Sequence, residues 1–273
     1  MTARTATYFL ANQPTTFDFA PWLSTVRTMG FESVSFVGDE FKDKGEAYTP
    51  EIARARMEHI LRPLCALAGM PIVEGVGDYH RIVGAGISHM MASLGFLHRT
   101  RGDIWRFPYE RRHDHITVTI RQSFRNEHRN SNRPEWDKFV AWAENAGFRV
   151  VVIEDCEETI AFKGTNVAFD PMPIAERMDA YSCRMNLGVA NGPMMLCWLS
   201  AAPHLTVGMG KNSAQELAML AHPKGHDIPI GSQPVWFLPG QRLVWEADDA
   251  ETIIREFGEA MERPVVDTEN EGA

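Results

Sequence analysis

Apolar positions along the chain follow two spacings. Short apolar runs bounded by glycine or proline predict buried strands, whereas apolar residues three or four apart predict amphipathic helices. The predicted strands are residues 8–10, 33–37, 71–73, 116–120, 149–153, 186–190, 203–207 and 242–246. The predicted helices are residues 18–29, 51–67, 132–146, 174–181, 213–221 and 249–261. Because strands and helices alternate, we expect mainly parallel sheets joined by crossover helices.

An arginine-rich stretch containing Pro108 interrupts this alternation and predicts a linker between two Rossmann-like α/β domains. We expect an N-terminal domain at residues 1–112, which is reduced in size and includes the linker. The C-terminal domain is expected at residues 113–265. Residues 266–273 then form a frayed tail.

Composition agrees with a soluble globular protein. The chain has 273 residues, of which 44% are hydrophobic and 23% charged. Its longest apolar runs are too short to span a bilayer, and its first residues do not resemble a secretory signal, so we expect a cytoplasmic protein without an integral membrane segment. The four scattered cysteines predict buried free thiols rather than disulfides or a zinc site.

The charge distribution is uneven. The net charge of −9 argues against nucleic-acid binding, yet residues 98–133 contain nine arginines and no lysine against four acids. Arginine is suited to bidentate contacts with carboxylate or phosphate. The alternative is a linker whose arginines pair with acids elsewhere in the chain.

A strand, a tight turn and a helix start are predicted around Asn191, Gly192, Pro193 and Met194. The first N–H groups of a helix lack intrahelical partners and lie at the positive end of the helix dipole. We therefore expect this turn to bind an anion, such as a diphosphate. The alternative is that glycine and proline only turn the chain and begin a helix.

Polar side chains follow two neighbouring predicted strands of the same unit. In open parallel sheets, ligands bind beyond the carboxyl ends of the strands. Arg121 and Arg125 leave strand 116–120 where a diphosphate would need counter-charge, and Arg129 or Arg133 could add to it. Glu154 and Asp155 end strand 149–153 and are candidates for contact with a ribose or a base.

Residues 115–262 resemble the C-terminal, nucleotide-sugar-binding domain of GT-B glycosyltransferases, especially the heptosyltransferase-like group. The resemblance lies in residues 116–125, in residues 136–139 before 147–153, and in residues 186–194 before 203–207. It implies that Gly192, Pro193 and Met194, together with Arg121 or Arg125, contact the diphosphate of a nucleotide-sugar donor. One departure is Met195-Leu196, where the family usually has a histidine.

An inverting sugar transfer needs a general base near the acceptor hydroxyl, and the first domain would supply it. The possible bases there are Asp18, Asp39, Glu74, Asp78 and His80, and the candidates we retain are Asp39, Asp78 and His80. No metal is expected, since Pro223 and Gly225 between His222 and His226 preclude a regular helical pair and no third ligand is apparent. Arginines and a helix N-terminus could carry the charge of the leaving diphosphate, so no divalent cation is required. The glycine pairs 75/77 and 84/86 lack the strand-turn-helix setting of a dinucleotide fingerprint, so no cofactor is expected.

The resemblance implies a metal-independent glycosyltransferase that moves a sugar from a nucleotide-activated donor to a glycan or another acceptor, as in polysaccharide biosynthesis. Two alternatives remain open. One is a catalytically degenerate relative that binds nucleotide or phosphosugar without turnover. The other is an enzyme similar to sugar-nucleotide epimerases.

Overall fold

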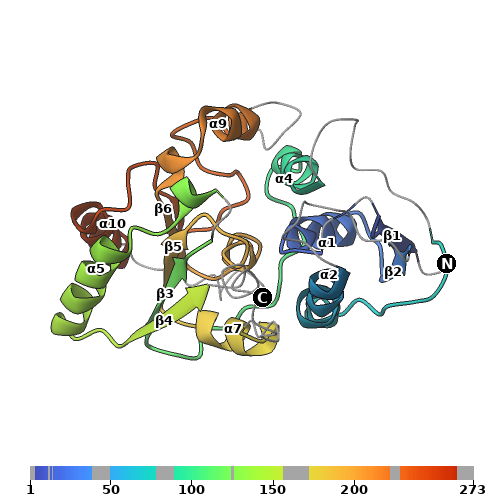
Figure 1. Cartoon of the computed structure of the whole chain (residues 1–273), viewed down its shortest axis with the longest axis horizontal. Helices are drawn as coiled ribbons and strands as arrows, with labels where there is room; N and C mark the ends of the chain where they lie inside the picture. The colour runs from blue at the N-terminus through green and yellow to red at the C-terminus, as the bar shows by residue number, and fades with distance from the viewer. Residues whose placement is uncertain are drawn as a thin grey trace, which may run out of the picture.

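The computed structural model describes residues 4–11, 13, 15–38, 50–77, 89–123, 126–155, 172–221 and 228–262. It shows a mixed α/β protein with one two-stranded and one five-stranded sheet, both parallel throughout. Figure 1 shows the larger sheet on one side of the molecule and the smaller sheet on the other, with helices between them. The predicted class, Rossmann-like α/β with parallel sheets, is confirmed.

The N-terminal part is built on a parallel pair of strands in which Thr5 lies opposite Ser33. Its elements are β1 (Thr5–Phe9), α1 (Phe19–Thr28), β2 (Ser33–Val37), α2 (Pro50–Arg56), the π-helical turn η1 (Met57–Leu61), α3 (Arg62–Leu67) and α4 (His89–Arg99). The predicted third strand at residues 71–73 is reduced to a single parallel bridge between Ile72 and Val34.

The C-terminal part holds the five-stranded sheet in the order β4-β3-β5-β6-β7. Its strands are β3 (Ile116–Arg121), β4 (Val150–Asp155), β5 (Met185–Val189), β6 (His204–Val207) and β7 (Gln241–Leu243). Its helices and turns are η2 (Glu127–Arg129), α5 (Arg133–Asn145), α7 (Ile174–Tyr181), α8 (Met195–Trp198), η3 (Met209–Lys211), α9 (Ala214–Ala221) and α10 (Ala250–Glu262). The chain leaves β3 toward β4 and later returns to β5 on the other side of β3, so the strand order reverses between β3 and β5.

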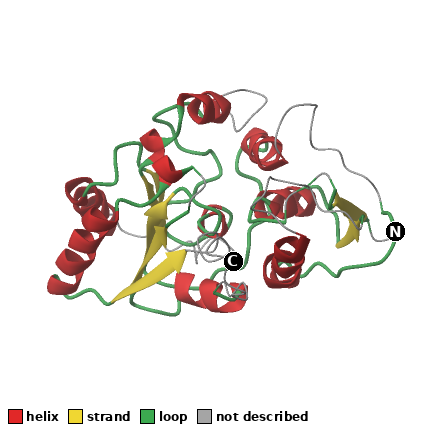
Figure 2. Ribbon diagram, in the orientation of Figure 1, coloured by secondary structure: helices red, strands yellow, loops and turns green. Residues whose placement is uncertain are grey.

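Helices cover both faces of this sheet (Figure 2). On one face, α5 and α10 enclose a core centred on Trp136, Phe139 and Phe257, whose last two rings meet edge to face at 5.5 Å. On the other face, α7 and α8 belong to a hydrophobic cluster that continues into α1 and α3. Since this cluster has members on both sides of residue 112, the division into two domains there stays a prediction.

The linker is held to both parts of the molecule. Trp105 N–H donates to Thr28 Oγ1 (2.9 Å) in α1, and Phe107 N–H donates to Leu199 O (2.8 Å) just after α8. Farther along, Tyr109 donates its hydroxyl to Cys183 O (3.0 Å). These bonds fix the path of the linker between the two sheets.

The described cysteines are buried and free, as predicted. Burial raises the pKa of the Cys65 thiol to about 12 and that of Cys183 to about 11. Both therefore stay protonated and unreactive at neutral pH. Cys156 lies outside the described residues.

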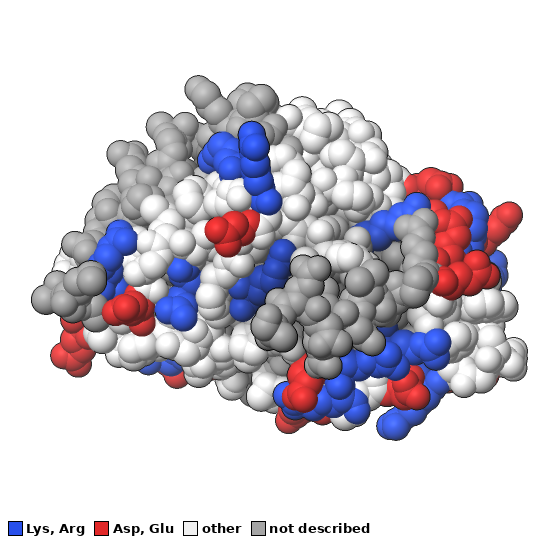
Figure 3. Space-filling model, turned by 180° about the vertical axis from the view of Figure 1, so that it is seen from behind, with Lys and Arg blue, Asp and Glu red and all other residues white. Residues whose placement is uncertain are grey.

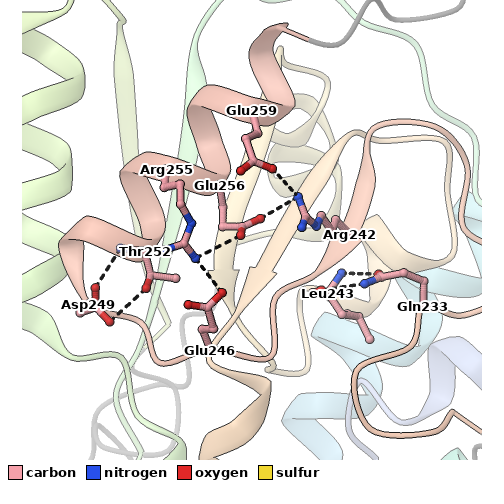
Figure 4. A network of polar contacts seen from close by, with 9 residues as sticks. All are labelled: Gln233, Arg242, Leu243, Glu246, Asp249, Thr252, Arg255, Glu256 and Glu259. Carbon is pink, nitrogen blue, oxygen red and sulfur yellow. Dashed lines mark hydrogen bonds and ion pairs between the residues drawn. The ribbon is translucent and has the colours of Figure 1, made fainter.

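A charged network fixes α10 to the end of the sheet (Figure 4). Glu256 is buried, with 4% of its surface exposed, and its carboxylate lies 2.7 Å from Arg242 Nη1 of β7. Arg255 Nη2 contacts both Glu256 (3.3 Å) and Glu246 (2.7 Å). At the start of the helix, Asp249 accepts the N–H of Thr252 (2.8 Å), which satisfies one of the first unpaired donors.

Removing Arg242 should destabilise the protein because it leaves a buried carboxylate with one cation fewer. For Arg242→Met we expect a loss of about 1–3 kcal/mol in the free energy of unfolding, measured by denaturant titration. Arg62→Met is the control, since Arg62 and Glu58 form an exposed pair on one helix face that should contribute at most about 1 kcal/mol. Equal losses in the two variants would contradict this account.

His204 gives the fold a second testable property. It is fully buried beside Trp198, and desolvation lowers its pKa to about 3 from an ordinary 6.5. As the pH falls, the imidazole of residue 204 is protonated in the unfolded chain before it is protonated in the folded one. The free energy of unfolding therefore decreases as the pH drops from about 6.5 toward about 3. His204→Phe should reduce that slope by up to about 1.4 kcal/mol per pH unit in unfolding titrations. An unaltered slope in His204→Phe would show that protonation of His204 does not contribute to it.

Candidate functional site

The strand order defines where a ligand site is expected. Between β3 and β5 the connections leave the sheet in opposite directions, and in open α/β sheets this opens a crevice at the carboxyl ends of the strands. β3 ends at Arg121 and β5 ends at Val189. The segments that follow these two strands therefore form the candidate site.

The segment after β3 is held in place by Asn130. Its side-chain amide accepts the N–H of Ser123 (2.9 Å) and donates to the carbonyl of the same residue (2.8 Å). Arg121 Nη1 donates to Asn130 Oδ1 and to Asn126 O (3.3 Å), and Asn126 itself has a left-handed backbone. The guanidinium of Arg121 is thus positioned over the end of its own strand by neutral oxygens.

Arg129 reaches from the same segment to β5. It ends η2, and its Nη2 donates to Ala190 O (2.8 Å), the residue directly after β5. The N–H of Arg129 donates to Asn126 O (2.9 Å), the oxygen that also accepts Arg121 Nη1. The structure therefore brings two arginines to the point between β3 and β5. Sequence reasoning treated Arg129 only as a possible addition.

The Asn-Gly-Pro turn differs from the expectation. Asn191 Oδ1 accepts the N–H of Met194 (2.9 Å), Gly192 O accepts that of Met195 (3.0 Å), and Pro193 O accepts that of Leu196 (3.0 Å). The expectation that this turn leaves its N–H groups unpaired is wrong for Met194, Met195 and Leu196. α8 has only four residues, and the Met194 side chain is fully buried. One donor remains: Asn191 Nδ2 is buried and has no hydrogen-bond partner.

Gly192 has a packing role that the sequence did not reveal. A Cβ atom at this position would lie 2.9 Å from Phe17 Cβ and 3.2 Å from Phe17 Cδ2. Phe17 lies between β1 and α1, so the segment after β1 of the small sheet touches the segment after β5 of the large one. Glycine is needed here for close contact between the two parts of the protein.

Glu154 and Asp155 end β4 beside β3, where Asp155 lies opposite Arg121 in register. The Glu154 carboxylate pairs with Arg133 Nη1 (2.6 Å), and Arg133 also pairs with Asp137 (2.7 Å) in α5. Arg133 is thus engaged at the edge strand, away from β5. The assignment of Glu154 and Asp155 to a nucleoside stays a prediction.

Most arginines of the linker have structural partners. Arg111 pairs with Asp114 (2.5 Å), and Arg112 pairs with Asp179 (3.3 Å) at the end of α7. Arg106 donates to Trp236 O, and burial lowers its pKa. On the face shown in Figure 3, basic and acidic side chains lie next to one another. Of these three arginines, Arg112 fits the alternative interpretation of a linker paired with acids elsewhere, whereas Arg111 has a local acid and Arg106 a backbone carbonyl.

Four predicted site residues lie outside the described part of the chain: Asp39, Asp78, His80 and Arg125. Within the described ranges, no three His, Cys, Asp or Glu side chains are grouped so that they could hold a metal ion. A search of the same residues finds no helix long and apolar enough to cross a membrane.

Sequence reasoning missed a second group of charges at this edge. Lys211, at the end of η3, pairs with Asp248 and donates to Asn130 O (3.1 Å). His128 and Arg129 both contact Glu216 of α9, at 3.0 and 3.5 Å. The sequence could have indicated this group, because the glycine-containing segment Gly208-Met209-Gly210-Lys211 directly follows a predicted strand.

No family model matches the chain, and no curated protein matches it. Among solved structures, it is similar to the bacterial iron-containing dodecameric glycosyltransferase TibC from enterotoxigenic E. coli H10407, with 12% sequence identity and a TM-score of 0.40. The match covers 76% of this chain and 59% of that one, so the chain spans about three fifths of the length of TibC. A likeness of this size assigns neither a family nor an activity.

The contact between Gly192 and Phe17 can be tested by adding a methyl group. Gly192→Ala should cost about 1–3 kcal/mol in the free energy of unfolding, because the new Cβ meets Phe17 at 2.9 Å. Gly258→Ala is the matched control, because Gly258 lies inside α10 with nothing within 4 Å of its Cβ position. That substitution should stabilise the protein by roughly 0.5–1 kcal/mol through helix propensity. Denaturant titration measures the free energy of unfolding of both variants. An unchanged value in Gly192→Ala would contradict the contact with Phe17.

Proposed function

We propose that the carboxyl ends of β3 and β5 bind the diphosphate of a nucleotide-activated sugar. The observation that carries this proposal is the placement of Arg121 and Arg129, from one segment, against the ends of both strands where the strand order reverses. Planar guanidinium groups bind phosphate oxygens in pairs, which suits a diphosphate better than a neutral ligand. Asn191 Nδ2, in the turn after β5, adds a buried donor without a hydrogen-bond partner.

The proposed reaction is transfer of the sugar to a hydroxyl of a glycan or another acceptor. The bond between the anomeric carbon and the diphosphate breaks, and a bond to the acceptor oxygen forms. Arg121 and Arg129 would stabilise the charge that develops on the departing diphosphate. The acceptor proton goes to a general base, for which Asp39, Asp78 and His80 remain the proposed candidates, and Arg125 remains a proposed further phosphate ligand.

A second candidate is binding of the same ligand without turnover. It is favoured by Phe17, which packs directly on Gly192 and so closes one side of the turn that resembles a donor site. Slow hydrolysis of the donor by water would support a transferase. Its absence with every donor tested, despite tight nucleoside diphosphate binding, would support a binding protein. An altered sugar on an intact nucleotide would indicate an epimerase.

Replacing either arginine should weaken diphosphate binding selectively. For Arg121→Ala and Arg129→Ala, isothermal titration should show the affinity for a nucleoside diphosphate falling by about ten- to 150-fold, since a charge-assisted hydrogen bond contributes ~1.5–3 kcal/mol. Affinity for the matching nucleoside should change little. A thermal-shift screen with UDP, GDP, ADP and CDP first selects the base.

Arg62→Ala is the control for this experiment, because Arg62 forms an exposed pair with Glu58 in the N-terminal part. It should leave the affinity for the nucleoside diphosphate unchanged. If Arg121→Ala and Arg129→Ala reduced nucleoside and nucleoside diphosphate binding equally, the phosphate assignment would be wrong.

A further inference from the structure

Glu216 places a negative charge on one of the two proposed phosphate ligands. It lies in the first turn of α9, with Oε1 at 3.5 Å from Arg129 Nη1 and Oε2 at 3.0 Å from His128 Nε2. Burial opposes its ionisation, yet hydrogen bonds from His128 and Ser213 and the charge of Arg129 keep the pKa of Glu216 below its usual value. The side chain is therefore a carboxylate at neutral pH.

The nitrogens of Arg129 are not equally available. Nη2 donates to Ala190 O at 2.8 Å, and Nε is buried with no hydrogen-bond partner. Nη1 is the nitrogen that meets Glu216, and both side chains keep surface in contact with solvent, with 28% and 27% exposed. A phosphate oxygen that approaches Arg129 from solvent at Nη1 therefore meets the Glu216 carboxylate at the same position.

We infer that Glu216 is an internal counter-ion that competes with the ligand's phosphate for Arg129 and so sets the affinity and selectivity of the site. This inference rests on the proposed function. An uncharged nucleoside does not displace a carboxylate from a guanidinium, whereas a diphosphate brings more negative charge than Glu216 and also reaches Arg121. Glu216 thus makes the site selective for highly charged ligands at the expense of affinity.

The geometry allows this exchange without loss of α9. Glu216 Oε2 accepts the N–H of Ser213 (2.7 Å), and Ser213 Oγ accepts the N–H of Glu216 (3.2 Å), which is a capping box. The cap uses Oε2, and the contact with Arg129 uses Oε1. Displacement from Arg129 therefore leaves the helix cap in place, and glutamine at this position retains an amide oxygen for it.

The test is isothermal titration of the full chain with pyrophosphate. Glu216→Gln should bind pyrophosphate about two- to tenfold more tightly than the wild type, because the partly buried pair with Arg129 no longer has to be broken. The gain should disappear in the Glu216→Gln/Arg129→Ala double variant. Glu58→Gln is the matched control, since it removes the same charge from an arginine pair in the N-terminal part, and it should bind as the wild type does.

The outcomes separate this inference from the proposed function. If Arg129→Ala weakens pyrophosphate binding but Glu216→Gln binds equally or less tightly than the wild type, the competition is refuted and the diphosphate site stands. If Arg121→Ala and Arg129→Ala both bind pyrophosphate as the wild type does, or if no variant binds it, both are refuted. Binding detected only in Glu216→Gln supports the inference. Circular dichroism checks that α9 and the fold persist.

Discussion

The arrangement of the candidate site depends on one buried carboxylate, that of Asp248. With 1% of its surface exposed, it accepts the backbone N–H of Asn132 (2.8 Å) and the indole N–H of Trp136 (2.9 Å), and it pairs with Lys211. A buried charge is tolerated when it is paired and hydrogen-bonded: Oδ2 of Asp248 accepts both hydrogen bonds, and Oδ1 lies against Lys211 Nζ. It thereby ties together the segments that follow β3, β6 and β7.

The position of Arg121 follows from this anchor. Lys211, held by Asp248, donates to the carbonyl of Asn130 (3.1 Å), and the side chain of Asn130 holds both Ser123 and Arg121. Ser131, next to it, accepts the N–H of Arg121 through its hydroxyl (3.0 Å). The guanidinium of Arg121, at the end of β3, is thus fixed through a chain of contacts that begins in the core. Such fixed donors bind a diphosphate with less loss of conformational freedom than mobile ones would.

Much of the fold could be predicted from the sequence because its signals are local. The residues of β2 and α7 coincide with the predicted ranges, and glycines end α1 and α5 where expected. The caps were harder to predict. Asn132 precedes α5 but makes no side-chain cap, and the Ser131 hydroxyl serves Arg121 instead. Neither polar residue before α5 caps it, because the neighbouring strand engages the Ser131 hydroxyl, and no local pattern records that neighbour.

The candidate site was only partly predictable for the same reason. Strand ends could be located, so Arg121 and the turn at Asn191 were identified. The role of Arg129 depends on reaching Ala190, and that of Gly192 depends on Phe17, which is 175 positions away in the chain. Charge counting indicated carboxylate or phosphate partners for the arginine-rich window without distinguishing the two, and Arg111, Arg112 and Arg133 pair with acids.

The acidic character of the chain explains why so few arginines remain for a ligand. With a net charge of −9, a carboxylate is available near most guanidinium groups, and each ion pair removes a potential phosphate ligand. Arg121 donates to the oxygens of Asn126 and Asn130, which hold its guanidinium at the end of β3. Arg129 shares its charge with Glu216, and its contribution to the site therefore depends on where α9 places that carboxylate. In this protein the affinity of the sheet edge for phosphate depends less on the number of arginines than on which acids lie beside them.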